Sequence, residues 1–291
     1  MLKVSKLTVY DLIKKGELDA YRVGRQMRID KQTLDNYKQQ GKGSSASQKN
    51  IGSTGAGIQR TGQIVISGQD PCMDMLARGL EAKGGQPLRS QSGSLDGLIA
   101  MYNGTADIVS THLYDAETNS YNIPYIKKLF VSQSFIVMHF ISREAGFYVA
   151  KGNPKRLISW DDLKQNGIVL ANRERGAGAR VLLDEQLRLH EIKTDSINGY
   201  DFIQTSHMAV AGMVASGRAD IGVGIERVAS GANIDFVPLI TESYDLVLLK
   251  TKENEQLIRN VQELLTSREL QDELASLGYD IKNMGEVLYE Q

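Results

Sequence analysis

The pattern of apolar and polar residues divides the 291-residue chain into three parts. Residues 1–40 hold short helical and alternating runs, and residues 64–291 alternate short apolar strands with amphipathic helices. Between them, residues 41–63 are rich in Gly, Ser and Gln and almost free of apolar residues, which is typical of a flexible linker. The sequence therefore predicts a small N-terminal module, a linker and a large α/β domain.

Strands and helices alternate through the large part in the order expected for a mostly parallel sheet. The apolar pattern predicts a helix after Pro71, a helix from near Ala177 and C-terminal helices over 254–290. Strands are predicted at residues 64–68, 87–91, 106–110, 129–140, 146–151 and 167–171.

An internal repeat predicts two similar lobes. Ser94 is followed by a short helical run, Gly104 and the strand opening Ala106-Asp107-Ile108. Ser206 is followed by the same pattern, with Gly217 and Ala219-Asp220-Ile221. Both copies are typical of a capping serine, a helix, a glycine stop and a strand. Chance similarity of two βαβ units is the alternative.

The turn from Asn172 to Arg180 is the strongest candidate binding element. It lies between an apolar strand and a helix start, and it contains Gly176, Gly178 and three arginines. Backbone N–H groups and the helix dipole favour an anion at such a place. The turn lacks both the P-loop and the third glycine of a dinucleotide fingerprint. A plain turn with solvated arginines is the alternative.

Charge is unevenly distributed although the formal net charge is only −1. Residues 1–63 carry twelve Lys or Arg against five Asp or Glu, a net +7, and the rest carries 22 against 30, a net −8. A basic small end suggests contact with a polyanion. The single cysteine, Cys72, and the lack of a membrane-length apolar run or apolar leader predict a cytoplasmic protein.

Residues 1–40 contain a helical run from Leu2 to Leu18, followed by Tyr21-Arg22-Val23-Gly24-Arg25, where alternation around Gly24 predicts a hairpin. In these two segments the chain resembles the excisionase-type winged helix-turn-helix. The family normally begins with a further helix, so we expect either that this copy is partly truncated or that the true start lies upstream. The resemblance implies DNA contacts from the helix and phosphate contacts from the wing. The residues concerned are Lys6, Thr8 and Tyr10 on the helix and Arg22, Arg25 and Arg28 on the wing.

Residues 64–291 resemble the type II periplasmic binding-protein fold, on the strength of the repeat and of Ile158 to Leu163 before its second copy. The resemblance implies two lobes, lobe I at about 64–140 and 245–291 and lobe II at about 146–237. It also implies two crossing strands, Phe135–Lys151 and Phe236–Lys250, with a ligand in the cleft between the lobes. The turn from Asn172 to Asp184 is more narrowly similar to a molybdate-binding-like domain, although relatives carry Ser and Thr where this chain has Ala177 and Ala179.

The candidate ligand groups lie at strand ends and helix starts of both lobes. They are Ser67, Asp70, Ser94 and Thr111 in the first lobe, and Arg173, Gly176, Gly178, Arg180, Thr205, Ser206 and Glu226 in the second. We expect molybdate or tungstate as ligand, with sulfate or phosphate as the next candidates. An amino acid held by Asp70 or Glu226 is the alternative.

The sequence predicts a one-component transcription regulator that is a dimer or higher oligomer, because DNA half-sites are read in pairs. A stand-alone small-molecule-binding protein is the second hypothesis. An enzyme of the same fold is disfavoured, because the four histidines lack metal-ligand spacing. The segment Gly93 to Gly97 is also not a nucleophile elbow, because its serine is at the second position and the G-x-S-x-G motif has it at the third. We therefore expect neither a catalytic set nor a metal centre.

Overall fold

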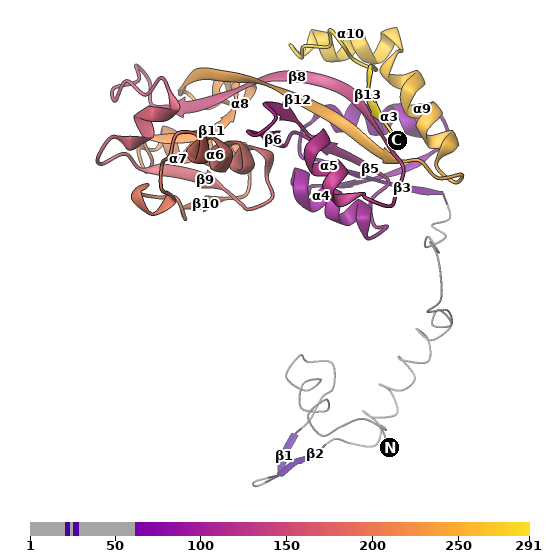
Figure 1. The fold of residues 1–291 in the computed structure, drawn as a ribbon, viewed down its shortest axis with the longest axis horizontal. Coiled ribbons are helices and arrows are strands. Elements are labelled where there is room, and N and C mark those ends of the chain that lie inside the picture. Colours follow the sequence, from indigo (N-terminus) through magenta and orange to yellow (C-terminus); the bar gives the residue numbers. More distant parts are fainter. Residues whose placement is uncertain (1–20, 24–25, 29–61) are drawn as a thin grey trace. The chain divides into compact units, whose positions relative to one another are not determined.

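The computed structural model describes residues 62–291 and the backbone of residues 21–23 and 26–28 (Figure 1). The chain forms two compact units, Met1–Gly57 and Ile58–Gln291. In the first, β1 (Tyr21–Val23) pairs antiparallel with β2 (Gln26–Arg28). This confirms the predicted hairpin around Gly24. The helices predicted on either side of it and most of the predicted linker lie outside the described residues.

A nine-stranded sheet forms the centre of the second unit. Parallel pairs lie at its two ends, β3 with β4 and β5, and β9 with β10 and β11. The central strands β8 and β12 run antiparallel to each other and to their neighbours, so the sheet is parallel only toward its ends. The order is β10 (Ile203–Gln204), β9 (Leu170–Arg173), β11 (Ile221–Ile225), β8 (Phe135–Val149), β12 (Asp235–Leu249), β5 (Ile108–Thr111), β3 (Gln63–Ser67) and β4 (Gln86–Ser90), with β13 (Val287–Glu290) beside β8.

The two crossing strands β8 and β12 join the halves of this unit and confirm the prediction. They pair along their whole length, from Phe135 opposite Leu249 to Val149 opposite Asp235. β8 is buried at nearly every position, which explains its almost continuous apolar sequence. One predicted strand is wrong in part, because residues 129–134 precede β8. Leu129 is the last residue of helix α5 (Ile123–Leu129), which Pro124 helps to start.

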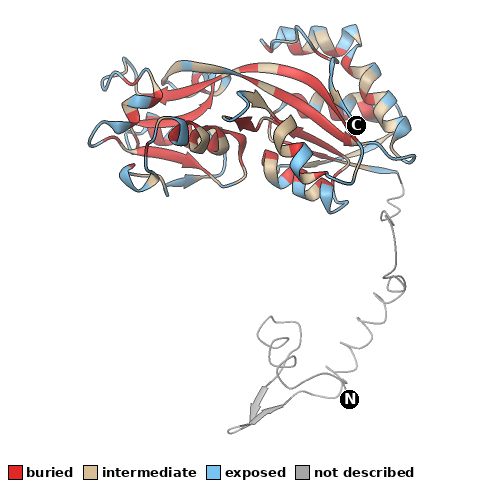
Figure 2. Ribbon diagram, in the orientation of Figure 1, coloured by how far each residue is buried: buried red, intermediate tan, exposed pale blue. Residues whose placement is uncertain are grey.

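Helices cover both ends of the sheet and define two lobes (Figures 1 and 2). Lobe I comprises β3 to β7, β13, α3 (Cys72–Ala82), α4 (Ser94–Tyr102), α5, α9 (Glu255–Leu265) and α10 (Arg268–Ser276). Lobe II comprises β9 to β11, α6 (Gly178–Leu189), α7 (His207–Ala215) and α8 (Glu226–Ser230), with the short 3₁₀ helices Trp160–Lys164 and Thr194–Ser196. Each lobe buries two apolar clusters against the sheet.

Two features of the lobes differ from the predictions. The C-terminal helices end at Ser276, and the last residues form strand β13, which pairs with β8 instead of continuing a helix. A hairpin of β6 (Tyr114–Asp115) and β7 (Ser120–Tyr121) leaves lobe I and packs Tyr114 into the core of lobe II. A main-chain N–H from this hairpin, that of Ala116, donates to Glu185 of α6.

The internal repeat has a structural basis in its aspartates. Asp107 accepts a hydrogen bond from the main-chain N–H of Val65 at 2.7 Å, and Asp220 accepts one from that of Val169 at 2.8 Å. Each aspartate thus ties its own strand to the neighbouring parallel strand just before pairing begins. The glycines before them, Gly104 and Gly217, both have positive φ, which ends each helix without strain.

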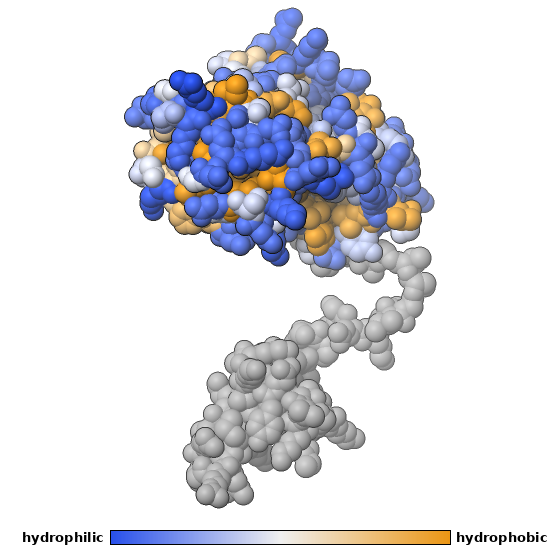
Figure 3. Space-filling model, turned by 60° about the vertical axis from the view of Figure 1, so that its left-hand side comes forward, coloured by the Kyte–Doolittle hydropathy of each residue, from blue (hydrophilic) through white to orange (hydrophobic). Residues whose placement is uncertain are grey.

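The surface of the second unit is mostly polar on the face shown in Figure 3, with apolar residues in scattered patches. The exposed large apolar side chains are spread over many elements, with Val131 and Ile158 the most exposed at 76% and 67%. Single exposed apolar residues are normal on a soluble domain. Within the part that the structure describes, no helix combines the length and apolar character needed to span a membrane.

A buried polar cluster lies where β8 and β12 meet lobe I. The Asp245 carboxylate is 1% exposed and accepts hydrogen bonds from Asn122 Nδ2 at 2.6 Å and Ser243 Oγ at 2.7 Å. It also contacts His139 Nδ1 at 2.8 Å. Asn122 adopts a φ of 64° and receives the main-chain N–H of Leu113, so this cluster holds the chain between β5 and α5.

We predict that Asp245→Ala lowers the free energy of unfolding by about 3–5 kcal/mol, because it leaves the groups around it buried without their common partner. Asp235→Ala is the control, since Asp235 lies on the same strand in an exposed pair with Lys151 and should matter far less. Urea denaturation of both variants measures the difference. Equal losses in the two variants would contradict a structural role for the cluster.

Candidate functional site

Two helix N-termini, one from each lobe, face each other across the cleft. Helix α4 of lobe I has Gly93 as its N-cap and helix α6 of lobe II has Ala177, and neither N-cap makes a side-chain capping bond. The main-chain N–H of Leu95 donates to the carbonyl of Gly176 at 3.0 Å and joins the two helix starts. The Leu95 N–H is satisfied by this bond. The other first-turn N–H groups have no partner inside their helix, so both helix starts present donors and positive dipole ends at one place.

A small cavity of about 10 Å³ lies at this meeting point. Its walls come from the loop after β3, the start of α4, the end of β5, the β9–α6 turn and strand β12. The lining residues are Gly68, Gln69, Ser92, Gly93, Ser94, Ser110, His112, Arg173, Ala177, Gly178 and Tyr244. We call it the cleft cavity. This volume is about enough for one water molecule, so a larger ligand can enter only if the two lobes move apart.

Glycine is needed on the lobe II side for steric reasons. Gly176 has a φ of 86°, which an L side chain rarely adopts. A Cβ on Gly178 would lie 2.2 Å from Cδ2 of His112 and 2.7 Å from its carbonyl oxygen. The sequence Gly176-Ala177-Gly178 therefore lets the start of α6 approach lobe I closely.

Ser94 does not cap α4 as predicted, because it is the first helical residue and its hydroxyl bonds to His112. The Ser94 hydroxyl accepts the main-chain N–H of His112 at 3.2 Å and lies 3.0 Å from Nδ1 of the same ring. Either atom can be the donor in the second contact, because a hydroxyl has one O–H and two acceptor lone pairs. Burial, aided by Arg143, His207 and Arg173, places the pKa of His112 well below its ordinary value. His112 is therefore neutral at the cavity, and a neutral imidazole carries one N–H donor.

Arg173 lies in the cavity wall, but its charge is already matched. Its side chain is 2% exposed and bonds to Glu174 through Nε at 2.8 Å. A second nitrogen donates to Oε1 of Gln69 at 2.7 Å, which links lobe II to lobe I. The sequence predicted Arg173 here, and the structure adds that a glutamate neutralises it.

Arg180 does not line the cavity. It pairs with Asp184 at 3.0 Å, lies over the Tyr200 ring at 4.2 Å and donates to the carbonyl of Arg173 at 3.2 Å. Arg180 therefore stabilises the β9–α6 turn without lining the cavity. The carbonyl of Gly176 contacts α4 directly, although Gly176 is not among the cavity residues.

Two predicted residues of lobe I lie behind the cavity wall. Ser67 is buried, and its hydroxyl has no hydrogen-bond partner among the described residues. Thr111 donates to Oδ1 of Asn122 at 3.1 Å. Their chain neighbours Gly68 and Ser110 line the cavity in their place. The Ser110 hydroxyl donates to that of Tyr244 at 2.6 Å.

Asp70 belongs to a buried ion-pair cluster and not to the cavity lining. It pairs with Arg143 at 2.5 Å and accepts hydrogen bonds from Tyr279 Oη at 2.6 Å and Cys72 N at 2.9 Å. Burial opposes its ionisation, but Arg143 and these hydrogen bonds hold the pKa of Asp70 below its ordinary value. Arg143 also pairs with Glu242. With its oxygens occupied in this way, Asp70 is unsuited to holding an ammonium ligand.

The remaining predicted residues of lobe II do not line the cavity. Ser206 is exposed and caps α7 by accepting the N–H of Ala209 at 3.1 Å, and exposed Thr205 offers its carbonyl toward Arg173 at 3.5 Å. Glu226 lies at the start of α8 and borders a different hollow. Sequence reasoning missed Gln69 and Tyr244 as cavity residues. Gln69 follows a predicted strand end, whereas nothing marked Tyr244 within its apolar strand.

The candidate DNA-contacting residues fall largely outside this description. Lys6, Thr8, Tyr10 and Arg25 lie outside the described residues, while Arg22 and Arg28 lie on β1 and β2. In the part of the chain that the structure covers, no group of three or more His, Cys, Asp or Glu could hold a metal ion.

Two family profiles match the chain. A profile described as a PBP superfamily domain matches residues 77–266, and one described as a helix-turn-helix domain matches residues 1–42. The uncharacterized protein YvgK of Bacillus subtilis is 48% identical over 295 residues, which cover 100% of this chain and 95% of YvgK. An uncharacterized Clostridium pasteurianum protein from a ferredoxin gene 5' region is 39% identical over 112 residues, or 38% of this chain and 99% of that one.

Solved structures with a similar fold bind different ligands. An ABC-type phosphate transport receptor from Vibrio cholerae has a TM-score of 0.51 at 16% identity, with 75% of this chain and 99% of that chain covered. The sulfate-binding protein SubI of Mycobacterium tuberculosis has a TM-score of 0.53 at 15% identity and coverage of 75% and 85%. AbpA of Streptococcus pneumoniae, bound to L-arginine, has a TM-score of 0.52 at 14% identity and coverage of 74% and 94%. These likenesses show the fold and leave the ligand open.

We predict that stability falls as the pH drops below about 6.5, because His112 in the cleft cavity and His207 at the start of α7 both have lowered pKa values. Burial disfavours their charged forms in the folded state, so the unfolded chain binds more protons in this range. The free energy of unfolding should fall by up to about 1.4 kcal/mol per pH unit for each histidine. Urea titrations between pH 7.5 and 5.5 measure this slope. A double variant of His112→Asn and His207→Asn that kept the full slope would refute the assignment.

Proposed function

Because the chain belongs to the PBP superfamily, we propose that it is a one-component transcription regulator that senses a small oxyanion in the cleft cavity. The helix-turn-helix match at residues 1–42 supports DNA binding, and the two-lobed domain supports binding of a small ligand. The phosphate receptor and the sulfate-binding protein with a similar fold are binding proteins, which supports a sensor in preference to an enzyme. We place the regulator in the cytoplasm and expect a dimer or higher oligomer, since paired half-sites need paired modules.

The observation that carries the ligand proposal is the convergence of two helix N-termini without side-chain caps, α4 and α6. Together they supply N–H groups and two positive dipole ends from opposite lobes. Neutral His112 adds a further donor. An anion bound here contacts both lobes at once, so it favours their closed arrangement over any open one.

The nature of these donors favours a compact dianion over an amino acid. Arg173 is paired with Glu174, so the site is built mainly from neutral donors. Asp70 and Glu226, the carboxylates that could have held an ammonium group, do not line the cavity. Molybdate and tungstate remain our preferred ligands, with sulfate and phosphate as the next candidates. Discrimination among these tetrahedral anions would depend on how far the lobes separate, because the ions differ mainly in radius.

The test for the cleft uses a matched pair of glycine variants. Gly178→Ala should abolish oxyanion binding, because the new Cβ meets His112 and pushes α6 away from α4. Gly212→Ala in α7 is the control, since a Cβ there meets nothing within 4 Å. Isothermal titration with molybdate, tungstate, sulfate and phosphate should show binding to the parent protein and to Gly212→Ala only.

Two results would overturn the oxyanion assignment. One is the absence of heat with all four anions. The other is heat with an organic ligand that Gly178→Ala removes, which would place that ligand in the cleft instead.

The test for DNA binding uses the hairpin of the N-terminal unit. Arg25→Ala should weaken retention of the gene's own upstream DNA and of unrelated DNA alike, and lower the salt slope by about 1, as expected for a phosphate contact. Arg218→Ala, an exposed change on lobe II, is the control. Gel-shift titrations at several salt concentrations provide the measurement. Complete lack of DNA retention by a protein that binds oxyanion would favour the alternative, a stand-alone small-molecule-binding protein.

A further inference from the structure

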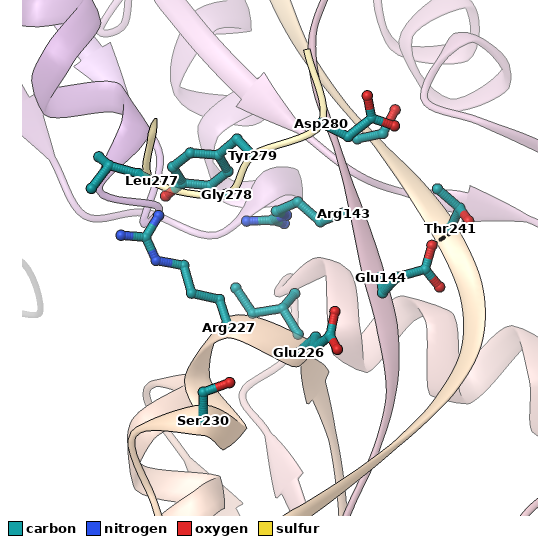
Figure 4. A pocket seen from close by; sticks show the side chains of 12 residues that line it. Arg143, Glu144, Glu226, Arg227, Ser230, Thr241, Leu277, Gly278, Tyr279 and Asp280 are labelled. Carbon is teal, nitrogen blue, oxygen red and sulfur yellow. Dashed lines mark hydrogen bonds between the residues drawn. The ribbon is translucent and has the colours of Figure 1, made fainter. Parts of the chain in front are cut away.

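A second and larger hollow lies beside the crossing strands (Figure 4). Its volume is about 320 Å³, which is within the range of small-molecule sites. None of its lining residues belongs to the cleft cavity. We call it the hinge hollow, and it is lined by Ser142, Arg143, Glu144, Ile225, Glu226, Arg227, Ser230, Thr241, Leu277, Gly278, Tyr279 and Asp280.

Both lobes and both crossing strands contribute to the hinge hollow. Residues Glu226 to Ser230 come from α8 of lobe II, and residues Leu277 to Asp280 follow α10 of lobe I. Gly278, with a φ of 81°, turns the chain at the end of α10. The Tyr279 side chain is 7% exposed and donates to Asp70 at 2.6 Å, so this wall is well fixed.

The hollow contains charged groups without partners. Glu226 and Arg227 are exposed, and neither makes a hydrogen bond or an ion pair within the described residues. Arg227 instead lies over the Tyr279 ring, with its guanidinium carbon 4.5 Å from the ring centre. The Arg143 side chain is only 7% exposed, and its buried Nε has no hydrogen-bond partner among the described residues. Several polar groups that line this hollow are therefore available to hydrogen-bond or pair with a ligand.

The arrangement of charge indicates the class of ligand. In Figure 4 Arg227 lies at one end of the hollow, and Glu144 and Asp280 lie at the other, with Glu226 between them. Arg143 is already matched by Asp70 and Glu242, so acidic groups are in excess. A carboxylate is suited to Arg227, and cationic nitrogen to the three acids. Leu277 and Ile225 supply apolar surface for a short carbon chain.

We propose that the hinge hollow is a second ligand site, which takes a small zwitterion with surplus positive charge, such as a basic amino acid. It is separate from the oxyanion site, and the proposal does not depend on the identity of the cleft ligand. A molecule bound there contacts α8 of lobe II and the segment after α10 of lobe I. Because it bridges the lobes, its binding is coupled to their closure and hence to the affinity of the cleft, and the coupling is reciprocal.

The experiment is isothermal titration of the full chain with L-arginine, followed by matched variants. Glu226→Gln and Arg227→Gln should each weaken L-arginine binding about tenfold or more, since each removes a charged partner. Arg268→Gln and Glu269→Gln alter an adjacent, exposed pair of opposite charges on α10 that lines neither cavity, and should bind as the parent does. Thermal melts verify that all four variants fold.

A molybdate titration in the same variants separates the two sites. Without L-arginine, Glu226→Gln and Arg227→Gln should retain the parent's molybdate affinity, and saturation with L-arginine should change that affinity in the parent only. Absence of L-arginine heat, or heat that is unchanged in both hinge variants, would overturn the proposal. So would loss of L-arginine binding in Gly178→Ala with the hinge variants unaffected, because that pattern places the amino acid in the cleft.

Discussion

The antiparallel pairing of β8 with β12 is the constraint on which the rest of the large unit depends. Each strand is fifteen residues long and belongs to both lobes, and the parallel strands of each lobe are added outward from this pair. The carboxyl ends of β3, β4 and β9 consequently point toward the same gap. Helices that follow these strands start there, which explains why helix N-termini collect at the cleft. Local sequence decides each helix start, and the shared strand pair decides that two of them meet.

Arg143 lies in the middle of this pair and connects the hinge with the cleft. Its guanidinium is held by Asp70 and Glu242, and it stacks over the ring of Tyr244 at 4.2 Å. Asp70 in turn starts the loop into α3, directly after the cleft residue Gln69. Burial raises the pKa of Glu242 although Arg143 opposes the shift, while Asp70 with its extra hydrogen bonds stays ionised. Since a buried ion cluster contributes little net stability, its value here lies in fixing one geometry at the hinge.

The cleft combines main-chain donors with arginines that are already paired. Arg173 and Arg180 each have an acidic partner next to them in sequence or one helical turn away. They therefore shape the β9–α6 turn more than they add charge to it. A site built in this way selects its ligand by size. An anion of matching size pairs with all the fixed N–H groups and binds tightly, whereas an anion that leaves donors unpaired binds more weakly. The hinge hollow differs, because Glu226 and Arg227 carry opposite charges and neither forms an ion pair within the described residues.

Much of the architecture was determined by the sequence itself. Alternating apolar strands, glycine stops at Gly104 and Gly217 and the paired Ala-Asp-Ile strands predicted two lobes, because such patterns reflect local burial. The crossing strands were predicted from the resemblance to the type II periplasmic binding-protein fold. The Asn172–Arg180 turn was likewise visible, since a strand, glycines and a helix start are contiguous in the chain. Only the tertiary structure decided which polar groups meet. Asp70 looked like a ligand group until Arg143 and Tyr279, 73 and 209 residues away, occupied it. Ser94 and Ser206 look alike in sequence, yet one bonds to His112 and the other caps a helix. Partners so distant in the chain leave no local pattern, so side-chain roles depended on the fold while the elements did not.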